Sequence, residues 1–395
     1  MSSSRHSVSC PLCHNNNIFK IFADGEKSLR SDGLIRDSQL CKFHCQNCGL
    51  AWSEQDMSDS SIPYLRSNGS SFFEISRCRC LSNGLRSILI DLKALLPERY
   101  SILEVGGGSF HTSQFLAESM PYNSFVSLEI SPERSPQEIA LPNLECKQQL
   151  LEDHAGRSYS VIFANMVLEH QASPILFLQK CQQLLTDKAC IIIIVPNAGI
   201  ISDELMFSDH LFHFTSLSFR YLSEALRLQL VHQGPAPWDS FSSVFILSNN
   251  TSLSVSGSCL SEKSYPRFSS FDSDTIQSLL EDRIKYLKSW SSSEMVTILK
   301  NWDNSKRYFL FGAGEFTQLV ECYMPALYSR VMGCIVTDIE CARPLKKPLF
   351  EANSIPDKSS SIVILGVKRK SRNAVRRQLL DRGFHSANLI GFQII

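Results

Sequence analysis

The chain lacks an excess of charge of either sign, a long hydrophobic run and an apolar segment at its start. Its 395 residues include 39 basic and 39 acidic side chains, so the positive field that nucleic-acid binding requires is missing. The longest purely aliphatic run, residues 191–195, is far too short to span a bilayer. Residues 1–6 are polar and lack the apolar core of a signal peptide. We therefore expect a cytoplasmic protein that binds neither nucleic acid nor membrane, and composition leaves its oligomeric state open.

Cysteine is plentiful, with 14 residues, but without a secretion signal most of the thiols are expected to be reduced. Four of them form two C-x-x-C knuckles about 30 residues apart. A two-residue gap lets both thiolates of a knuckle face one ion, and four thiolates form a closed, structural zinc site. We predict zinc at Cys10, Cys13, Cys45 and Cys48, in a zinc-ribbon domain of residues 1–62.

Two alternatives to this ligand set remain open. Reduced cysteines at chance spacing would bind no metal, although paired knuckles make that unattractive. His14, Cys41 and His44 lie close to the knuckles and are substitute ligands. A further pair, Cys78 and Cys80, has the wrong gap for a knuckle and is interpreted as structural.

The third glycine of a dinucleotide-binding fingerprint is also missing. Residues 101–111 run from an apolar strand through three glycines into the start of a helix, but Phe110 stands where that glycine would be. A pyrophosphate is therefore a poor fit, whereas a cofactor without phosphates needs only the close approach of a glycine backbone. An ordinary tight turn between strand and helix is the structural alternative.

Polar side chains end three of the predicted strands. Glu104 precedes the glycine turn, Glu129 ends the next strand and can accept both ribose hydroxyls, and Asn165 ends a third. In a parallel doubly wound sheet, ligands bind at the carboxyl ends of the strands. We therefore expect a cofactor to contact Glu104, Gly106, Gly108, Glu129 and Asn165.

This order of motifs resembles class I S-adenosylmethionine (SAM) methyltransferases over roughly residues 75–230. The resemblance implies an α/β fold, a Rossmann-like doubly wound sheet, and SAM bound around the glycine turn. We assign the core to residues 63–235. Glu169 and His170, after the third of these strands, either cap a helix and bond within the core or line the cofactor pocket.

Two histidines follow the strand that ends at Pro196 and Asn197. An imidazole near its unperturbed pKa is the natural general base at neutral pH, and a neighbouring carboxylate can orient it. We predict that His210 is this base and that Asp209 is its partner. For His213 we prefer a structural role at the start of the next helix, with Thr215 as the N-cap.

Residues 236–395 are predicted to form a second, Rossmann-like domain, and the Ser-, Asn- and Pro-rich residues 235–270 are expected to be a strand followed by a linker. A strand at residues 308–311 leads into Gly312-Ala-Gly314, but Thr317 replaces the third glycine, which disfavours an NAD site. We expect this domain to enclose or bind part of a substrate, or to be purely structural.

Together, the ribbon, the SAM core, the histidine and the C-terminal domain resemble bacterial sugar C-methyltransferases, which act on nucleotide-linked deoxysugars, typically 4-keto sugars. In that family a Tyr-x-Glu-His segment supplies the base. Here the matching positions are Phe207, Ser208, Asp209 and His210, so the tyrosine hydroxyl that would face an enolate is absent. The resemblance implies a small-molecule acceptor such as a nucleotide sugar, and C-methylation of it with His210 as base.

Other functions compete with this interpretation. An O- or N-methyltransferase of another metabolite would use the same core. A scaffold with a vestigial SAM site is a third alternative, against which the intact Glu104, Gly106, Gly108 and Glu129 argue. A nicotinamide enzyme that uses the C-terminal domain is disfavoured by Thr317.

Overall fold

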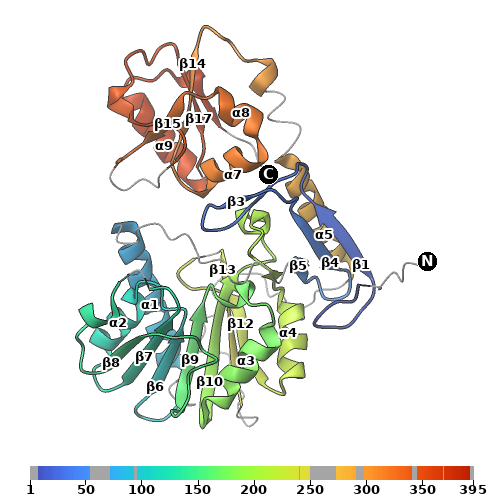
Figure 1. Ribbon diagram of the computed structural model, residues 1–395, viewed down its shortest axis with the longest axis vertical. Coiled ribbons are helices and arrows are strands. Elements are labelled where there is room, and N and C mark those ends of the chain that lie inside the picture. Colours follow the sequence, from blue (N-terminus) through green and yellow to red (C-terminus); the bar gives the residue numbers. More distant parts are fainter. Residues whose placement is uncertain are drawn as a thin grey trace. The chain divides into compact units, whose positions relative to one another are not determined.

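The computed structural model in Figure 1 describes residues 8–53, 72–92, 96–132, 134–239, 241–249, 273–290, 298–339, 345–367 and 369–391. The chain divides into two compact units. Unit 1 comprises Met1–Lys20, Lys42–Ile200 and His210–Leu280, and unit 2 comprises Ile21–Cys41, Ile201–Asp209 and Glu281–Ile395. Within the ranges described, none of the helices combines the length and the apolar character needed to cross a bilayer.

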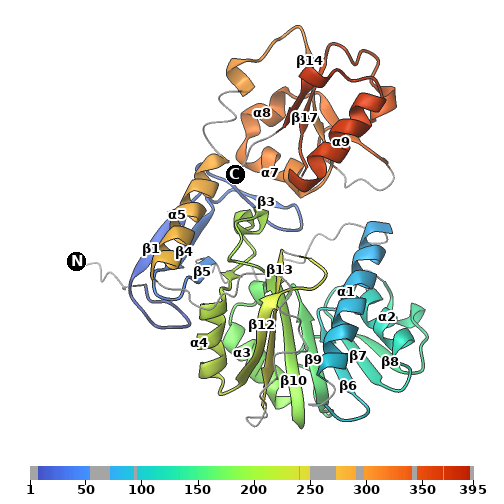
Figure 2. The ribbon, with the colours of Figure 1, turned by 180° about the vertical axis from the view of Figure 1, so that it is seen from behind.

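Unit 1 is built on a seven-stranded sheet in the order β12-β13-β10-β9-β6-β7-β8 (Figures 1 and 2). Its strands are β6 (Ser101–Val105), β7 (Ser124–Glu129), β8 (Leu144–Gln148), β9 (Tyr159–Asn165), β10 (Leu185–Pro196), β12 (Gln229–Pro235) and β13 (Ser242–Ser248). The five strands from β10 to β8 are parallel, and β13 runs antiparallel to both β10 and β12. The predicted doubly wound sheet is therefore confirmed, with an antiparallel edge.

Helices cover both faces of this sheet (Figures 1 and 2). They are α1 (Phe72–Asp91), α2 (His111–Ser119), α3 (Pro174–Gln183) and α4 (Ser216–Ala225). Alternate residues of β10 point to opposite faces of the sheet and pack against the helices on each face, as the two-residue period of a strand requires. Ile192 and Ile194 share a buried cluster with Leu85 of α1, whereas Ile191 and Ile193 pack in the cluster of α3 and α4.

The sheet extends beyond the predicted boundary at residue 235. Strand β13 pairs with the apolar end of β10 from Ser248 opposite Cys190 to Ser242 opposite Pro196, and all its residues are buried. The strand expected in this Ser-rich stretch is present, but its apolar centre, residues 244–247, completes the core of unit 1. Assigning residues 236–249 to the C-terminal domain was therefore wrong.

The ribbon forms a four-stranded sheet that differs from the predicted contiguous domain. Its order is β1 (Ile18–Phe22), β4 (Cys41–Cys45), β5 (Ala51–Ser53) and β11 (Phe212–His213). The last strand comes from far along the chain, and Ile21–Cys41, with the short pair β2 (Ser28–Leu29) and β3 (Ile35–Arg36), belongs to unit 2. A local spacing pattern does not reveal either of these long-range associations.

The C-terminal part of unit 2 is a five-stranded parallel sheet in the order β16-β15-β14-β17-β18. Its strands are β14 (Arg307–Phe311), β15 (Gly333–Val336), β16 (Leu349–Glu351), β17 (Ser361–Leu365) and β18 (Leu389–Gly391). The helices are α5 (Ser273–Ser289), which begins in unit 1, and α7 (Glu315–Tyr323), α8 (Pro325–Arg330) and α9 (Arg369–Asp381). The predicted Rossmann-like arrangement is confirmed.

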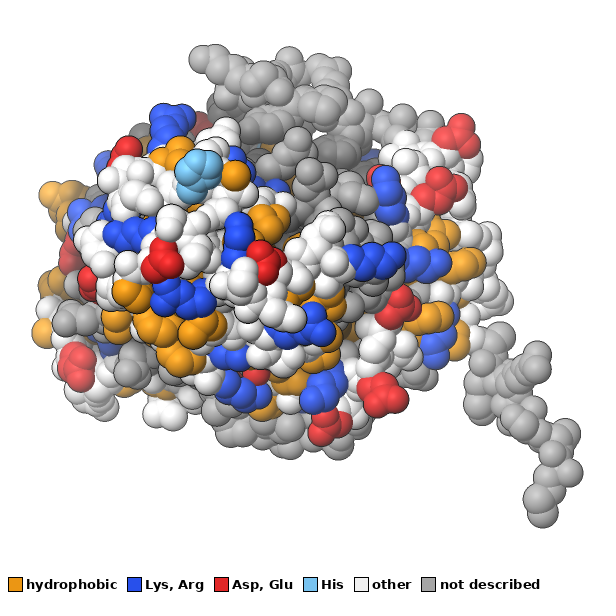
Figure 3. Space-filling view, turned by 90° about the horizontal axis from the view of Figure 1, so that it is seen from above, with side chains coloured by type: hydrophobic (Ala, Val, Ile, Leu, Met, Phe, Trp, Pro, Cys, Tyr) orange, Lys and Arg blue, Asp and Glu red, His pale blue; other side chains and the backbone are white. Residues whose placement is uncertain are grey.

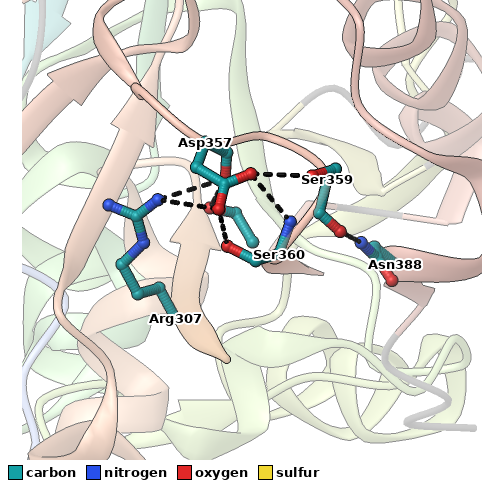
Figure 4. A network of polar contacts seen from close by, with 6 residues as sticks. Arg307, Asp357, Ser359, Ser360 and Asn388 are labelled. Carbon is teal, nitrogen blue, oxygen red and sulfur yellow. Dashed lines mark hydrogen bonds and ion pairs between the residues drawn. The ribbon is translucent and has the colours of Figure 1, made fainter. Parts of the chain in front are cut away.

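A polar network holds the loop that leads into β17 (Figure 4). The Asp357 carboxylate accepts hydrogen bonds from Ser360 and Ser359, which lower its pKa to about 2, and Arg307 lies 3.7 Å from it. Asn388 donates to the Ser359 carbonyl at 2.7 Å. These contacts join the starts of β14 and β17 to the turn before β18. On the face shown in Figure 3, basic and acidic side chains are interspersed, as the balanced composition predicts.

Candidate active site

The glycine turn after β6 is pressed against the end of β7. The amides of Gly106 and Gly107 both donate to the Leu128 carbonyl at 2.9 Å, and Gly106 has φ +79°. A Cβ on Gly107 would lie 2.2 Å from Ser127 Oγ, so only glycine allows this approach. The turn therefore leaves bare backbone at the carboxyl edge of the sheet, where a cofactor can lie.

Counted from Gly106, the third position of a G-x-G-x-x-G fingerprint is His111 and not, as predicted, Phe110, but Phe110 does adopt a conformation that glycine would favour. It caps α2 with φ +62° and is completely buried with Leu116 and Phe125. A left-handed backbone costs a residue with a side chain roughly 1–2 kcal/mol, which burial of a phenyl ring offsets. The ring thus fixes the turn by packing.

Glu129 is held at the edge of the turn by two backbone amides. Its Oε2 accepts from Gly108 N and its Oε1 from Ser131 N, both at 2.9 Å. These hydrogen bonds come from the glycine turn and from the end of β7, so the carboxylate lies at the carboxyl edge of the sheet, where a cofactor's ribose is expected. The side chain is only 3 % exposed, which makes its orientation fixed before any ligand arrives.

Glu104 lies beneath the turn. Its Oε2 accepts from Ser113 Oγ at 2.6 Å and from Ser127 Oγ at 2.5 Å. Burial raises the pKa of this carboxyl, and the two serine hydrogen bonds oppose that shift. Among the described contacts, Glu104 supports the turn from below. Asn165 ends β9, half-buried and opposite Ile194, at the same edge of the sheet.

Sequence reasoning missed a pair beside this turn, His111 and Arg134. Arg134 Nη1 donates to His111 Nδ1 at 3.0 Å, and burial, followed by the Arg134 charge, lowers the pKa of the imidazole. A hollow of about 760 Å³ opens here, lined in part by Ser131, Arg134 and Gln148. The signal available in the sequence was a histidine placed at the first residue of the helix after the glycines.

A second group gathers around η3 (Leu168–His170), which follows β9. Val167 lies directly against the glycine turn, since its Cγ2 is 2.4 Å from where a Cβ on Gly106 would be. The rings of His170 and His210 meet edge to face with centroids 4.6 Å apart, and Glu169 is completely buried. Ligand-type atoms of Glu169, His170 and His210 all lie within 4.8 Å of one another. His210 therefore contacts the segment that follows β9, and Val167 of the same segment contacts the glycine turn.

The remaining predicted residues near His210 have separate partners. Asp209 belongs to unit 2, where its two carboxylate oxygens accept from Ser31 N at 2.8 Å and Ser31 Oγ at 2.7 Å. His213 lies in β11, and Thr215 caps α4 in a reciprocal capping box with Ser218. The predicted N-cap is confirmed.

The four knuckle cysteines converge on one point in unit 1. Cys10 Sγ lies 3.6 Å from Cys48 Sγ, and Cys13 Sγ lies 3.5 Å from Cys45 Sγ. A tetrahedron with zinc–sulfur bonds of about 2.3 Å has edges of about 3.8 Å, so these thiols fit such an ion. Hydrogen bonds from Cys10 and then Cys48 lower the pKa of Cys45, and no disulfide joins cysteines of the described ranges. Four sulfur donors leave no position for a substrate.

Residues 79–233 match a family model described as a methyltransferase domain. This span holds the glycine turn, Glu129, Asn165 and His210. Residues 79–233 are a methyltransferase domain. The chain is a SAM-dependent methyltransferase, and its fold is the class I methyltransferase fold. No curated protein sequence matches it.

Solved structures similar to this methyltransferase are distant in sequence. A SAM-dependent methyltransferase from Aquifex aeolicus is 14% identical, with 44% of this chain and 97% of that chain covered and a TM-score of 0.35. The plantazolicin methyltransferase BpumL in complex with SAH is 14% identical, with 48% and 92% covered and a TM-score of 0.39. The CurJ carbon methyltransferase is 14% identical, with 46% and 61% covered and a TM-score of 0.37.

The Glu129 carboxylate is expected to supply much of the affinity for SAM. Glu129→Ala should weaken SAM binding by about 1.5–3 kcal/mol, the range for hydrogen bonds to a charged group, as measured by calorimetric titration. Glu118→Ala, on the exposed side of α2, is the matched control and should bind SAM normally. Unchanged SAM affinity of the Glu129 variant would show that another residue binds the ribose.

The cysteine cluster is expected to hold about one zinc per chain. Cys45→Ser should lose the metal and lower the yield of soluble protein, because folding of the ribbon is coupled to metal binding, while the methyltransferase sheet of the protein that is recovered stays folded. Cys41→Ser is the control and should retain the metal, as measured by elemental analysis. Full occupancy in the Cys45 variant would show that Cys41 or a histidine is a ligand, and a second zinc per chain would point to Glu169, His170 and His210.

Proposed function

We propose that this methyltransferase transfers a methyl group from SAM to a carbon of a small molecule, with His210 as the general base. The observation that carries the proposal is the contact between His210 and His170 beside the glycine turn, at the carboxyl edge where ligands of doubly wound sheets bind. The same edge holds Glu129, the residue that we propose binds the ribose of the cofactor.

SAM supplies an electrophilic methyl group on a sulfonium sulfur. His210 removes the acceptor's proton, the acceptor carbon then forms its bond to the methyl group, and the carbon–sulfur bond breaks. The buried position of His210, only 4 % exposed, keeps water from competing for the imidazole. A positioned base of this kind contributes roughly 10²–10⁴-fold to the rate. Alignment of the acceptor with the methyl group supplies a further part of the rate enhancement.

We propose a nucleotide-linked keto-deoxysugar as the acceptor, since a ketone acidifies the neighbouring C–H bond enough for an imidazole to remove its proton. Support for the sugar comes from the resemblance of the whole layout to sugar C-methyltransferases. Phe207 departs from the pattern of that family, because a buried phenylalanine stands where the family has a tyrosine with a hydrogen-bonding hydroxyl. An O- or N-linked acceptor would need the same base but no carbonyl.

A nicotinamide function of the C-terminal domain has less support. Thr317 Oγ1 donates to the Gly312 carbonyl at 2.7 Å and is completely buried, so the side chain fills the space that a third glycine would leave to a pyrophosphate. A vestigial scaffold also has less support, because the glycine turn, Glu104 and Glu129 are all present and are held by hydrogen bonds at the carboxyl edge of the sheet.

His210→Ala should leave SAM affinity and folding intact while it lowers turnover by roughly 10²–10⁴-fold. Turnover is measured with methyl-labelled SAM and a panel of nucleotide-linked 4-keto sugars, by mass spectrometry of the product. Without SAM, the variant should also stop exchanging the ketone's α-proton with solvent deuterium. Asp209→Asn should lower turnover by a smaller factor than His210→Ala.

The control variant is His213→Gln, which alters the next histidine in the segment, with its ring 6.2 Å from that of His210. It should retain most of the exchange activity. Exchange at the parental rate in His210→Ala, with loss in His213→Gln, would assign the base to His213. A His210 variant that fails to fold would instead favour a purely structural histidine.

A further inference from the structure

His210 lies shortly before β11, the fourth strand of the ribbon sheet. We call residues 210–215 the His210 segment. Its strand β11 pairs antiparallel with β5, with Phe212 opposite Trp52 and His213 opposite Ala51. Ser53 N donates to the Leu211 carbonyl at 2.9 Å, which extends the pairing toward His210. The backbone on which the proposed base is mounted is therefore ordered by the ribbon as well as by the methyltransferase sheet.

Lys42 makes a second connection, directly at His210. This lysine lies in β4, is completely buried, and donates from Nζ to the His210 carbonyl at 2.9 Å and to Ser53 Oγ at 3.1 Å. A buried ammonium is costly without its hydrogen-bond partners, so displacement of the His210 carbonyl carries a large penalty. Three residues farther along β4, Cys45 is a predicted metal ligand.

Thr215 makes the third connection, at the other end of the segment. Its Oγ1 donates to the Cys48 carbonyl at 2.7 Å, and its Cγ2 lies 3.1 Å from where a Cβ on Gly49 would be. Gly49 has φ +68° and donates its amide to the Cys45 carbonyl, which closes the second knuckle. The end of the His210 segment is thus fastened to the backbone of the metal ligands themselves.

We propose that the four-cysteine metal site is a positioning device for catalysis: the bound metal fixes the second knuckle, β4 and β5, and these hold His210 against His170 at the SAM edge. The ribbon would then control methyl transfer without contributing a group to the reaction. The catalytic part of this inference rests on the proposed role of His210, but the mechanical coupling does not.

The distribution of contacts predicts which functions metal loss affects. The hydrogen bonds described for the glycine turn and Glu129 involve Leu128 of β7, the turn itself and Ser131, none of which belongs to the ribbon. SAM affinity should therefore survive removal of the metal, whereas the His210 segment should loosen.

The experiment is hydrogen–deuterium exchange with mass spectrometry on the full chain, compared as purified, after zinc removal by a chelator, and after zinc is restored. Exchange in residues 210–215 should become at least about tenfold faster without metal and recover with it, because the strand pairing that protects these amides is lost. Residues 101–105 should be unchanged, and the SAM dissociation constant should change less than about twofold.

Two variants test the connection while the cysteines stay intact. Thr215→Val removes the hydroxyl that donates to Cys48, and Thr215→Ser, its matched control, retains it. Lys42→Met removes the ammonium, with exposed Lys20→Met as its control. Thr215→Val and Lys42→Met should keep one zinc but exchange faster in the His210 segment, while the two controls behave like the parent.

Unchanged exchange in residues 210–215 after metal loss would overturn the inference. So would a loss of protection throughout unit 1, because the metal would then be required for folding of the whole unit instead of for local positioning. Neither result depends on turnover, so this inference can fail while His210 remains the base. Conversely, a catalytically irrelevant His210 would leave the exchange results as predicted.

Discussion

The contact between the glycine turn and the end of β7 is the constraint on which the active-site architecture depends. Gly106 and Gly107 share the Leu128 carbonyl, and Gly108 donates to Glu129. This double contact brings bare backbone and a fixed carboxylate to the same edge of the sheet. The contact needs no pyrophosphate, which is why a phenylalanine at position 110 is compatible with cofactor binding.

The proposed catalytic base, His210, comes from a segment outside the methyltransferase sheet. His210 follows the fifth parallel strand but is placed by β5, Lys42 and Thr215. The proposed SAM contacts at the glycine turn and the proposed base therefore depend on different sets of hydrogen bonds. The proposed positioning of His210 would explain why a four-cysteine metal site is joined to a methyltransferase domain.

Features that depend on a few neighbouring residues could be predicted from the sequence. The glycine turn, the paired knuckles and the Thr215 cap are local, because each is formed within a few residues. Features that depend on pairing between distant segments could not. A strand was expected at β13, but only its pairing with β10 shows that it belongs to the methyltransferase sheet and not to the C-terminal domain.

The same distinction holds within the active site. Neither the contact between His170 and His210 nor the carboxylate of Asp209 on Ser31 follows from spacing, because each joins segments about 40 residues or more apart. His210 could be selected as a base from its position after a strand, but its neighbours could be identified only from the fold.

Photoaffinity labelling with an azido derivative of SAM tests the central claim, that this edge binds SAM, most directly. Peptide mapping by mass spectrometry should find the label within residues 101–111 and 124–131, and unlabelled SAM, but not NAD, should suppress it. Label confined to residues 312–317, or suppressed by NAD, would contradict the account.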